Sequence, residues 1–172
     1  MRPGHSDARI TAIYEGTTGI QSNDLIGRKI GRDRGAALAS LIDEMQGTLG
    51  QLKSDHPLAA LSRNSALDAL TRLRRSTDTL LAALASAPDR AMAVSVPFLN
   101  FCALAIGGWL MARAADRAAS KLANGTADRE FMEAKLASAH FYATQVLPQI
   151  FTLEHIVAHG SDAVVGTDPA LI

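Results

Sequence analysis

Apolar residues recur at spacings of three and four along most of this chain, which is the period of an amphipathic helix. The clearest example lies between residues 35 and 53, where one face carries Leu38, Leu41, Ile42, Met45, Leu49 and Leu52. Alternation of period two, the signature of a half-buried strand, does not extend over any useful length. The pattern therefore predicts an all-α protein.

Breaks in this pattern divide the chain into five predicted helices, over residues 17–29, 35–53, 58–85, 89–123 and 128–158. Asp55 is expected to cap the third helix, and Asn124-Gly125 and Gly160 are expected to end the fourth and fifth. Pro97 and Pro148 stand inside predicted helices and should kink them. The connections are short, so neighbouring helices should pack antiparallel. We expect a bundle of about four long helices, preceded by a loop and a short helix.

Residues 91–112 form a run without any charge, long enough to cross a bilayer. The run is rich in alanine and contains Pro97, Asn100 and the pair Gly107-Gly108, which suits a helix buried in a bundle better. We therefore predict no membrane span. The two glycines predict the close approach of another helix rather than a ligand contact.

Composition narrows the class of protein further. Hydrophobic residues make up 48% of the chain, enough for a sizeable core, and 17 basic residues balance 17 acidic ones. A net charge of zero gives no electrostatic reason to expect nucleic-acid binding. Cys102 is the sole cysteine, so no internal disulfide can form, and its apolar setting predicts an inert thiol. A reducing, cytoplasmic location fits.

Candidate metal and nucleophile sites are weak. His155 and His159 stand four residues apart on the last predicted helix, but no Glu-x-x-His pair or second helix supplies matching ligands. We expect solvated or capping histidines and no metal site. The serines lack the context of a nucleophile elbow.

One strip of sequence could carry chemistry. The residues Tyr14-Glu15-Gly16-Thr17 directly precede a predicted helix, where Thr17 or Thr18 could provide the N-cap. A carboxylate there could be an ordinary capping group. It could also be a general base, because Gly16 would let backbone approach a ligand and the helix start offers free N–H groups.

The full string resembles a known pattern. Asp7-Ala8-Arg9-Ile10, Ile13-Tyr14-Glu15-Gly16-Thr17, Ile20-Gln21 and Arg28-Lys29 closely match the acyl-CoA dehydrogenase pattern RIxxIYEGTxxIQ…R. Residues 35–160 resemble the extra C-terminal helical domain of the larger dehydrogenases, the type similar to methylmercaptopropionyl-CoA dehydrogenase. Phe98–Arg113 and Val146-Leu147-Pro148 carry that second likeness.

This resemblance implies a residue-level site. Glu15 would abstract the alpha proton of an acyl-CoA thioester, giving a trans-2-enoyl-CoA while the hydride passes to FAD. The backbone N–H of Glu15 would help to hold the thioester carbonyl. Gly16, Thr17 and Thr18 match positions that touch FAD. The implied enzyme is a flavoprotein oxidoreductase of fatty acid metabolism, with an electron-transfer flavoprotein as acceptor.

The resemblance also implies a division of the chain. Residues 1–34 would end the catalytic C-terminal domain, and residues 35–172 would form the extra helical bundle. The family's N-terminal helices and beta domain should lie upstream of Asp7. We therefore expect the chain alone to bind little FAD and to be inactive, and we expect the parent enzyme to be a homo-oligomer. The alternative is a non-catalytic helical module for oligomerisation or docking.

Overall fold

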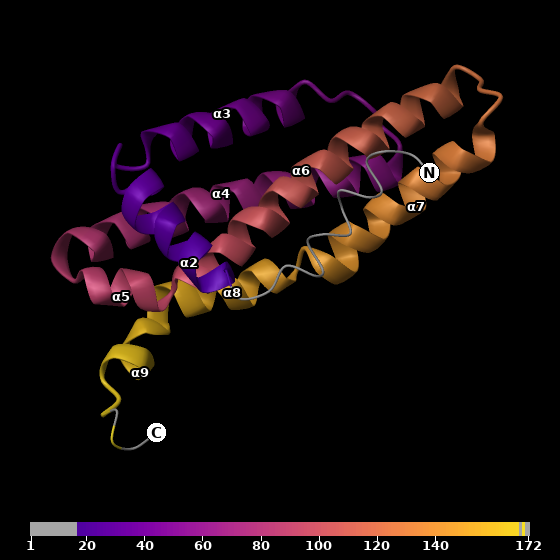
Figure 1. Ribbon diagram of the computed structural model, residues 1–172. Coiled ribbons are helices and arrows are strands. Elements are labelled where there is room, and N and C mark those ends of the chain that lie inside the picture. Colours follow the sequence, from indigo (N-terminus) through magenta and orange to yellow (C-terminus); the bar gives the residue numbers. More distant parts are fainter. Residues whose placement is uncertain (1–16, 169, 171–172) are drawn as a thin grey trace.

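The computed structural model describes residues 17–168 and residue 170. Every regular element in this part of the chain is helical, so the predicted all-α class is confirmed (Figure 1). The elements in order are α2 (Thr18–Asn23), the π-helix η1 (Asp24–Ile30), α3 (Ala36–Gly50), α4 (Pro57–Ser86), α5 (Pro88–Ala93), α6 (Ser95–Ala123), α7 (Arg129–Phe141), the π-helix η2 (Tyr142–Val146), α8 (Gln149–His159) and α9 (Ser161–Val165).

Long antiparallel helices form the body of the molecule. Figure 1 shows α4 and α6 running side by side, α7 returning along α6, and α3 lying across the other side of the pair. The main core gathers side chains from η1 to α8, and it includes Phe98 and Phe101 of α6, both fully buried. Burial of each such side chain stabilises the fold by about 1.5–3 kcal/mol.

A second, smaller cluster packs the far end of α6 against α4 and α7. It consists mostly of small side chains: Ala59, Ala115, Ala118, Ala119, Met132, Leu136 and Ala139. Side chains this small allow helix axes to approach closely. The alanine content of the sequence thus serves packing between helices at this end of the bundle.

The prediction of two long helices around Pro97 and Pro148 was wrong in detail. The chain breaks at Val94, so Pro97 falls in the first turn of α6, where its missing N–H removes no helical bond. The predicted last helix divides into α7, η2 and α8. Pro148 is the N-cap of α8, and the π-type bond from the N–H of Leu147 to the carbonyl of Tyr142 precedes it.

Caps also differ from expectation. His56, and not Asp55, caps α4: its Nδ1 accepts from the N–H of Leu58 at 3.3 Å. Thr17 occupies the N-cap of α2 as expected, but its side chain makes no capping bond. Gly35, at the start of α3, adopts a left-handed φ of 78° that favours glycine.

The glycine pair in α6 has the predicted role. A Cβ built on Gly107 would lie 2.1 Å from the hydroxyl of Tyr142, and one on Gly108 would lie 3.1 Å from a methyl of Leu147. The Tyr142 hydroxyl donates to the carbonyl of Leu104 at 3.0 Å. The missing side chains therefore admit the η2 segment against α6.

The length and composition of α6 are sufficient for a membrane span, but the core helix of a soluble protein can have the same length and composition. Here it is the central helix of the bundle and packs against α4, α7 and α8. Its Cys102 is buried, and this burial raises the pKa of the thiol to about 12. The thiol therefore remains protonated and unreactive at neutral pH, as predicted.

Candidate functional site

The predicted catalytic strip leads directly into a helix. Glu15 and Gly16 lie outside the described residues, and α2 begins at Thr18, three positions after Glu15. The carbonyl of Thr17 accepts the first helical bond, from the N–H of Gln21 at 2.8 Å. Thr17 is half-buried and Thr18 is exposed. The described part of the chain therefore begins directly after Gly16, at the N-cap of α2.

A buried hydroxyl network holds the inner face of α2 against α6. Ser22, the fully buried residue of α2, lies with its Oγ 3.1 Å from the Oγ of Ser95, the first residue of α6. Ser95 Oγ donates to Oδ1 of Asn23 at 2.8 Å, and Ser22 Oγ lies 2.8 Å from the carbonyl of Gly19. Because buried hydroxyls need partners, this network favours one seating of α2 over others.

Apolar contacts from η1 extend this attachment. Ile26 is fully buried in the main core, together with Ala91 and Val94 from the α5–α6 junction. A Cβ on Gly27 would lie 3.0 Å from the terminal methyl of Met92. The segment that follows the strip is therefore seated on α5 and the start of α6 by both polar and apolar contacts.

The outer face of α2 is open. Ile20 is 69% exposed, and a Cβ on Gly19 would meet nothing within 4 Å. Thr18 and Gln21 are also exposed. This face of α2 therefore has room for contact with a further domain.

The hydroxyl network between α2 and α6 was not predicted from the sequence, although the positions of its two serines are informative. Ser95 stands within an uncharged apolar run, and Ser22 stands four residues before Ile26 and eight before Ile30, a spacing that places all three on one helical face. A small hydroxyl on the buried face of a helix usually has a specific partner. The pattern could not identify that partner, because Ser22 and Ser95 are 73 residues apart in the sequence.

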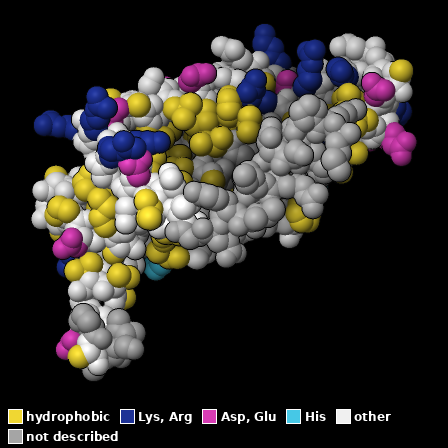
Figure 2. Space-filling view, in the orientation of Figure 1, with side chains coloured by type: hydrophobic (Ala, Val, Ile, Leu, Met, Phe, Trp, Pro, Cys, Tyr) yellow, Lys and Arg dark blue, Asp and Glu magenta, His cyan; other side chains and the backbone are white. Residues whose placement is uncertain are grey.

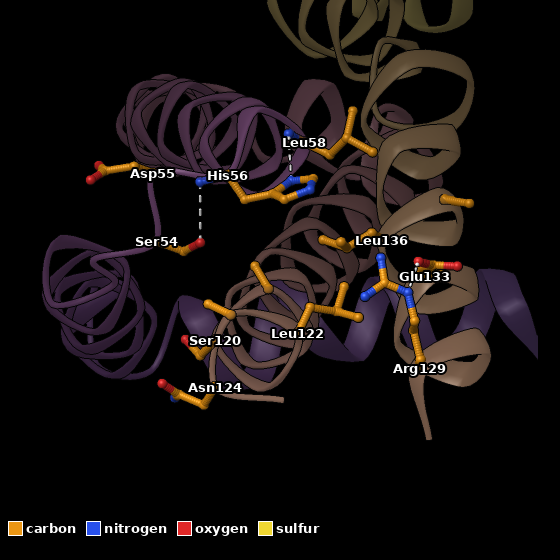
Figure 3. A pocket seen from close by; sticks show the side chains of 13 residues that line it. Ser54, Asp55, His56, Leu58, Ser120, Leu122, Asn124, Arg129, Glu133 and Leu136 are labelled. Carbon is orange, nitrogen blue, oxygen red and sulfur yellow. Dashed lines mark hydrogen bonds and ion pairs between the residues drawn. The ribbon is translucent and has the colours of Figure 1, made fainter. Parts of the chain in front are cut away.

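A second candidate is an open hollow at the other end of the bundle (Figure 3). It measures about 780 Å³ and lies between the start of α4, the end of α6 and the start of α7. Leu58, Leu122 and Leu136 form much of its apolar lining. From Ser95 to Ser120 the path along α6 is roughly 37 Å, so the hollow is far from α2.

Several of the polar side chains around this hollow are engaged in local structure. Figure 3 shows the ring of His56 turned to the N–H of Leu58, and Arg129 paired with Glu133 at 2.9 Å. No group of three possible metal ligands occurs in the described part of the chain. The rings of His155 and His159 lie 4.9 Å apart near the end of α8. These features give no catalytic arrangement to compare with the strip.

Comparison with known proteins agrees with the helical architecture. Residues 35–168 match the family model described as acetyl-CoA dehydrogenase C-terminal like. The chain therefore belongs to this family of dehydrogenase C-terminal helical domains.

Three curated proteins that match this chain are acyl-CoA dehydrogenases by name. The chain is 40% identical over 143 residues to 3-methylmercaptopropionyl-CoA dehydrogenase of Ruegeria pomeroyi, covering 83% of this chain and 24% of that protein. It is 34% identical over 165 residues to the broad-specificity linear acyl-CoA dehydrogenase FadE5 of Mycobacterium tuberculosis, covering 88% of this chain and 26% of that protein. A butyryl-CoA dehydrogenase of Syntrophomonas wolfei is 29% identical over 148 residues, 84% of this chain and 24% of that protein. The chain thus spans about a quarter of the length of these relatives.

Proposed function

We propose that this chain is the C-terminal part of an FAD-dependent acyl-CoA dehydrogenase, which converts an acyl-CoA thioester to the trans-2-enoyl-CoA. The observation that carries the proposal is the seating of α2. Its inner face is held on the bundle through Ser22, while its outer face, with Thr18 and Ile20, is open to a further domain. A strip attached to such a helix can be presented to a substrate bound mostly elsewhere.

Glu15 is the proposed base. Its carboxylate would accept the alpha proton of the thioester, and its backbone N–H would stabilise the negative charge that develops on the carbonyl oxygen. Exclusion of water by the bound substrate would raise the pKa of such a carboxyl towards a value useful for a base. The assignment of this role to Glu15 rests on the match of Tyr14-Glu15-Gly16-Thr17 to the dehydrogenase pattern.

FAD would supply the acceptor for the hydride that leaves the beta carbon. Gly16, Thr17 and Thr18 are the residues proposed to contact it. The structure fits this role at Thr18, whose side chain is exposed, and at Gly19, where nothing stands within 4 Å of a built Cβ. These residues provide a hydroxyl and an open stretch of backbone, which suit contacts to polar cofactor oxygens.

The test of the base is Glu15→Gln in the complete enzyme. We expect near-total loss of turnover, because the amide cannot accept the proton, with retained flavin and unchanged assembly. Turnover equal to that of the unaltered enzyme would leave only a non-catalytic role in oligomerisation or docking. The exposed Leu110, Phe131 and Phe141 are the observation that keeps this second role open.

The chain alone should bind little FAD, because most flavin and CoA contacts are expected in upstream domains. The measurement is the absorbance of the purified chain after addition of FAD and dialysis. Retention of flavin near one molar equivalent would contradict this expectation. For the complete enzyme, the proposal also includes an electron-transfer flavoprotein as the electron acceptor and a homo-oligomeric state.

A further inference from the structure

The network between Ser22, Ser95 and Asn23 connects two parts of the chain with different roles in the proposed enzyme. Ser22 and Asn23 belong to the helix that follows the base strip, whereas Ser95 belongs to the helical bundle. Ser22 is fully buried and Ser95 is 4% exposed. The contact therefore lies inside the protein and not on a solvated surface.

The hydrogen count gives this network a direction. The two serine hydroxyls hold two hydrogens, and three short contacts compete for them: Ser22 to Gly19, Ser22 to Ser95, and Ser95 to Asn23. The two contacts at 2.8 Å use both hydrogens, because Ser22 donates to the Gly19 carbonyl and Ser95 donates to Oδ1 of Asn23. The bond from Ser95 to Asn23 is therefore the hydrogen bond that joins α6 to α2. The Oγ atoms of Ser22 and Ser95 share a hydrogen only when the Ser22 hydroxyl turns away from Gly19.

Ser95 occupies the central position. It is the only one of the three that α6 supplies, and its Oγ contacts the side chains of both Ser22 and Asn23. Loss of this hydroxyl would leave Ser22 buried without its partner on α6 and would free the amide of Asn23. Apolar contacts of Ile26 would still hold η1 on the core, so the expected change is a looser α2 and not an unfolded bundle.

We propose that Ser95 is a positioning residue for the dehydrogenation: through Ser22 and Asn23 it fixes α2, the helix that begins three residues after Glu15. The extra helical bundle would then contribute directly to the rate of proton abstraction, beyond any role in assembly. This inference rests on the proposed function, since it requires Glu15 to be the base. Displacement of a reacting group by about 1 Å can lower a rate roughly 100-fold, so a small shift of α2 suffices.

The experiment compares Ser95→Ala with three other variants in the flavin-loaded complete enzyme. Ser95→Thr keeps the hydroxyl. Asn23→Ala removes the terminal acceptor at an exposed residue, and it serves if Ser95→Ala does not fold. Ser62→Ala is the matched control, because Ser62 is also a buried helical serine, but its hydroxyl donates to Leu58 within α4, at the far end of the bundle.

We expect Ser95→Ala to lower kcat roughly 10- to 100-fold, with flavin content unchanged and only a small change in KM. The pH profile of kcat should also shift, because the base would sit in a different environment. Asn23→Ala should show the same effects in weaker form, Ser95→Thr should restore most of kcat, and Ser62→Ala should leave kcat unchanged. In the isolated chain, the amides of α2 should exchange hydrogen faster in Ser95→Ala than in Ser62→Ala.

Two outcomes would overturn the inference and are distinguishable from failure of the proposed function. Normal kcat and pH profile in Ser95→Ala and Asn23→Ala, together with faster exchange of α2, would show that the network has only a structural role. Unchanged exchange of α2 would show that the network does not hold it. Full turnover of Glu15→Gln would instead remove the base itself, and the inference with it.

Discussion

At the residue scale, Gly107 marks the closest approach between α6 and η2. The Gly107→Ala variant must move the Tyr142 ring, because the new Cβ would lie 2.1 Å from its hydroxyl, and the bond to the Leu104 carbonyl would be lost with it. We expect a loss of about 1–3 kcal/mol in the free energy of unfolding. Urea denaturation of the isolated chain measures this change.

Gly47→Ala is a matched control that should change the free energy of unfolding in the opposite direction. Gly47 lies inside α3 at an exposed position, and a Cβ there meets nothing within 4 Å. Alanine should stabilise this helix by about 0.5–1 kcal/mol. Equal effects of the two substitutions would contradict the packing described for Gly107.

Glu154 is the central charge between α4 and α8. It pairs with Arg72 at 2.7 Å and with Arg75, and the Arg72 guanidinium also lies 4.6 Å from the centre of the Phe151 ring. Burial acts to raise the pKa of Glu154, but hydrogen bonds from Arg75 and Arg72 outweigh it and hold the pKa below its ordinary value of 4.5. The ionised form is therefore the one that stabilises the fold.

Glu154→Gln should lower the free energy of unfolding at neutral pH by about 1–2 kcal/mol, because both arginines lose a charged acceptor. The pH dependence has a definite sign. The contribution of Glu154 is fully present above its ordinary pKa and is lost as the pH falls through the lower, folded-state pKa. Unfolding measured between pH 7 and pH 3 should converge for the two proteins at the acid end, and a constant difference across this range would contradict the assignment.

At the scale of elements, the cap of α4 can be tested separately from its packing. His56→Ala removes the acceptor of the Leu58 N–H and should cost about 0.5–1 kcal/mol. His56→Asn should recover most of this loss, because asparagine is a strong N-cap residue. Thermal unfolding measures both, and an equal loss in the two variants would show that the histidine acts by packing instead.

The helical elements themselves were largely predictable. Their apolar faces repeat with a clear period, and the glycine pair in α6 indicated a close approach that Tyr142 and Leu147 indeed make. The positions of the breaks between helices were less predictable. Pro148 interrupts an apolar helical pattern and so indicates a break, but the sequence does not show that a π-helical segment precedes it.

The candidate site was predictable only in its local part. The strip at Glu15 and the helix after it follow from a short, contiguous pattern, and the helix is present from Thr18. The attachment of that helix to Ser95 depends on tertiary packing between distant segments. Sequence periodicity contains no information on which buried hydroxyls will meet.

At the scale of the whole molecule, several large apolar side chains remain outside the core. Figure 2 shows hydrophobic side chains gathered between charged ones on the face where α3 and α6 lie. The most exposed in the described chain include Ile20, Leu110, Phe131, Phe141, Phe151 and Val164. In a complete enzyme, surfaces of this kind suit contact with other domains or subunits.

The isolated chain should therefore self-associate as its concentration rises. Leu110→Lys should weaken this association, because it replaces a half-exposed apolar side chain of α6 with a charge. Ser138→Lys on the exposed face of α7 adds the same charge without removing an apolar group and should have less effect. Light scattering at low and high concentration is the measurement, and a strict monomer at both would count against the expectation.

The link between Ser22 and Ser95 also sets an order of events during synthesis. The ribosome must add 73 residues after Ser22 before the partner hydroxyl exists, which takes roughly 4–15 s at usual elongation rates. Throughout that interval Ser22 and Asn23 lack their partner on α6. A message cut short before the codon for Ser95 would encode every residue of the proposed base loop without the hydroxyl that joins α2 to α6.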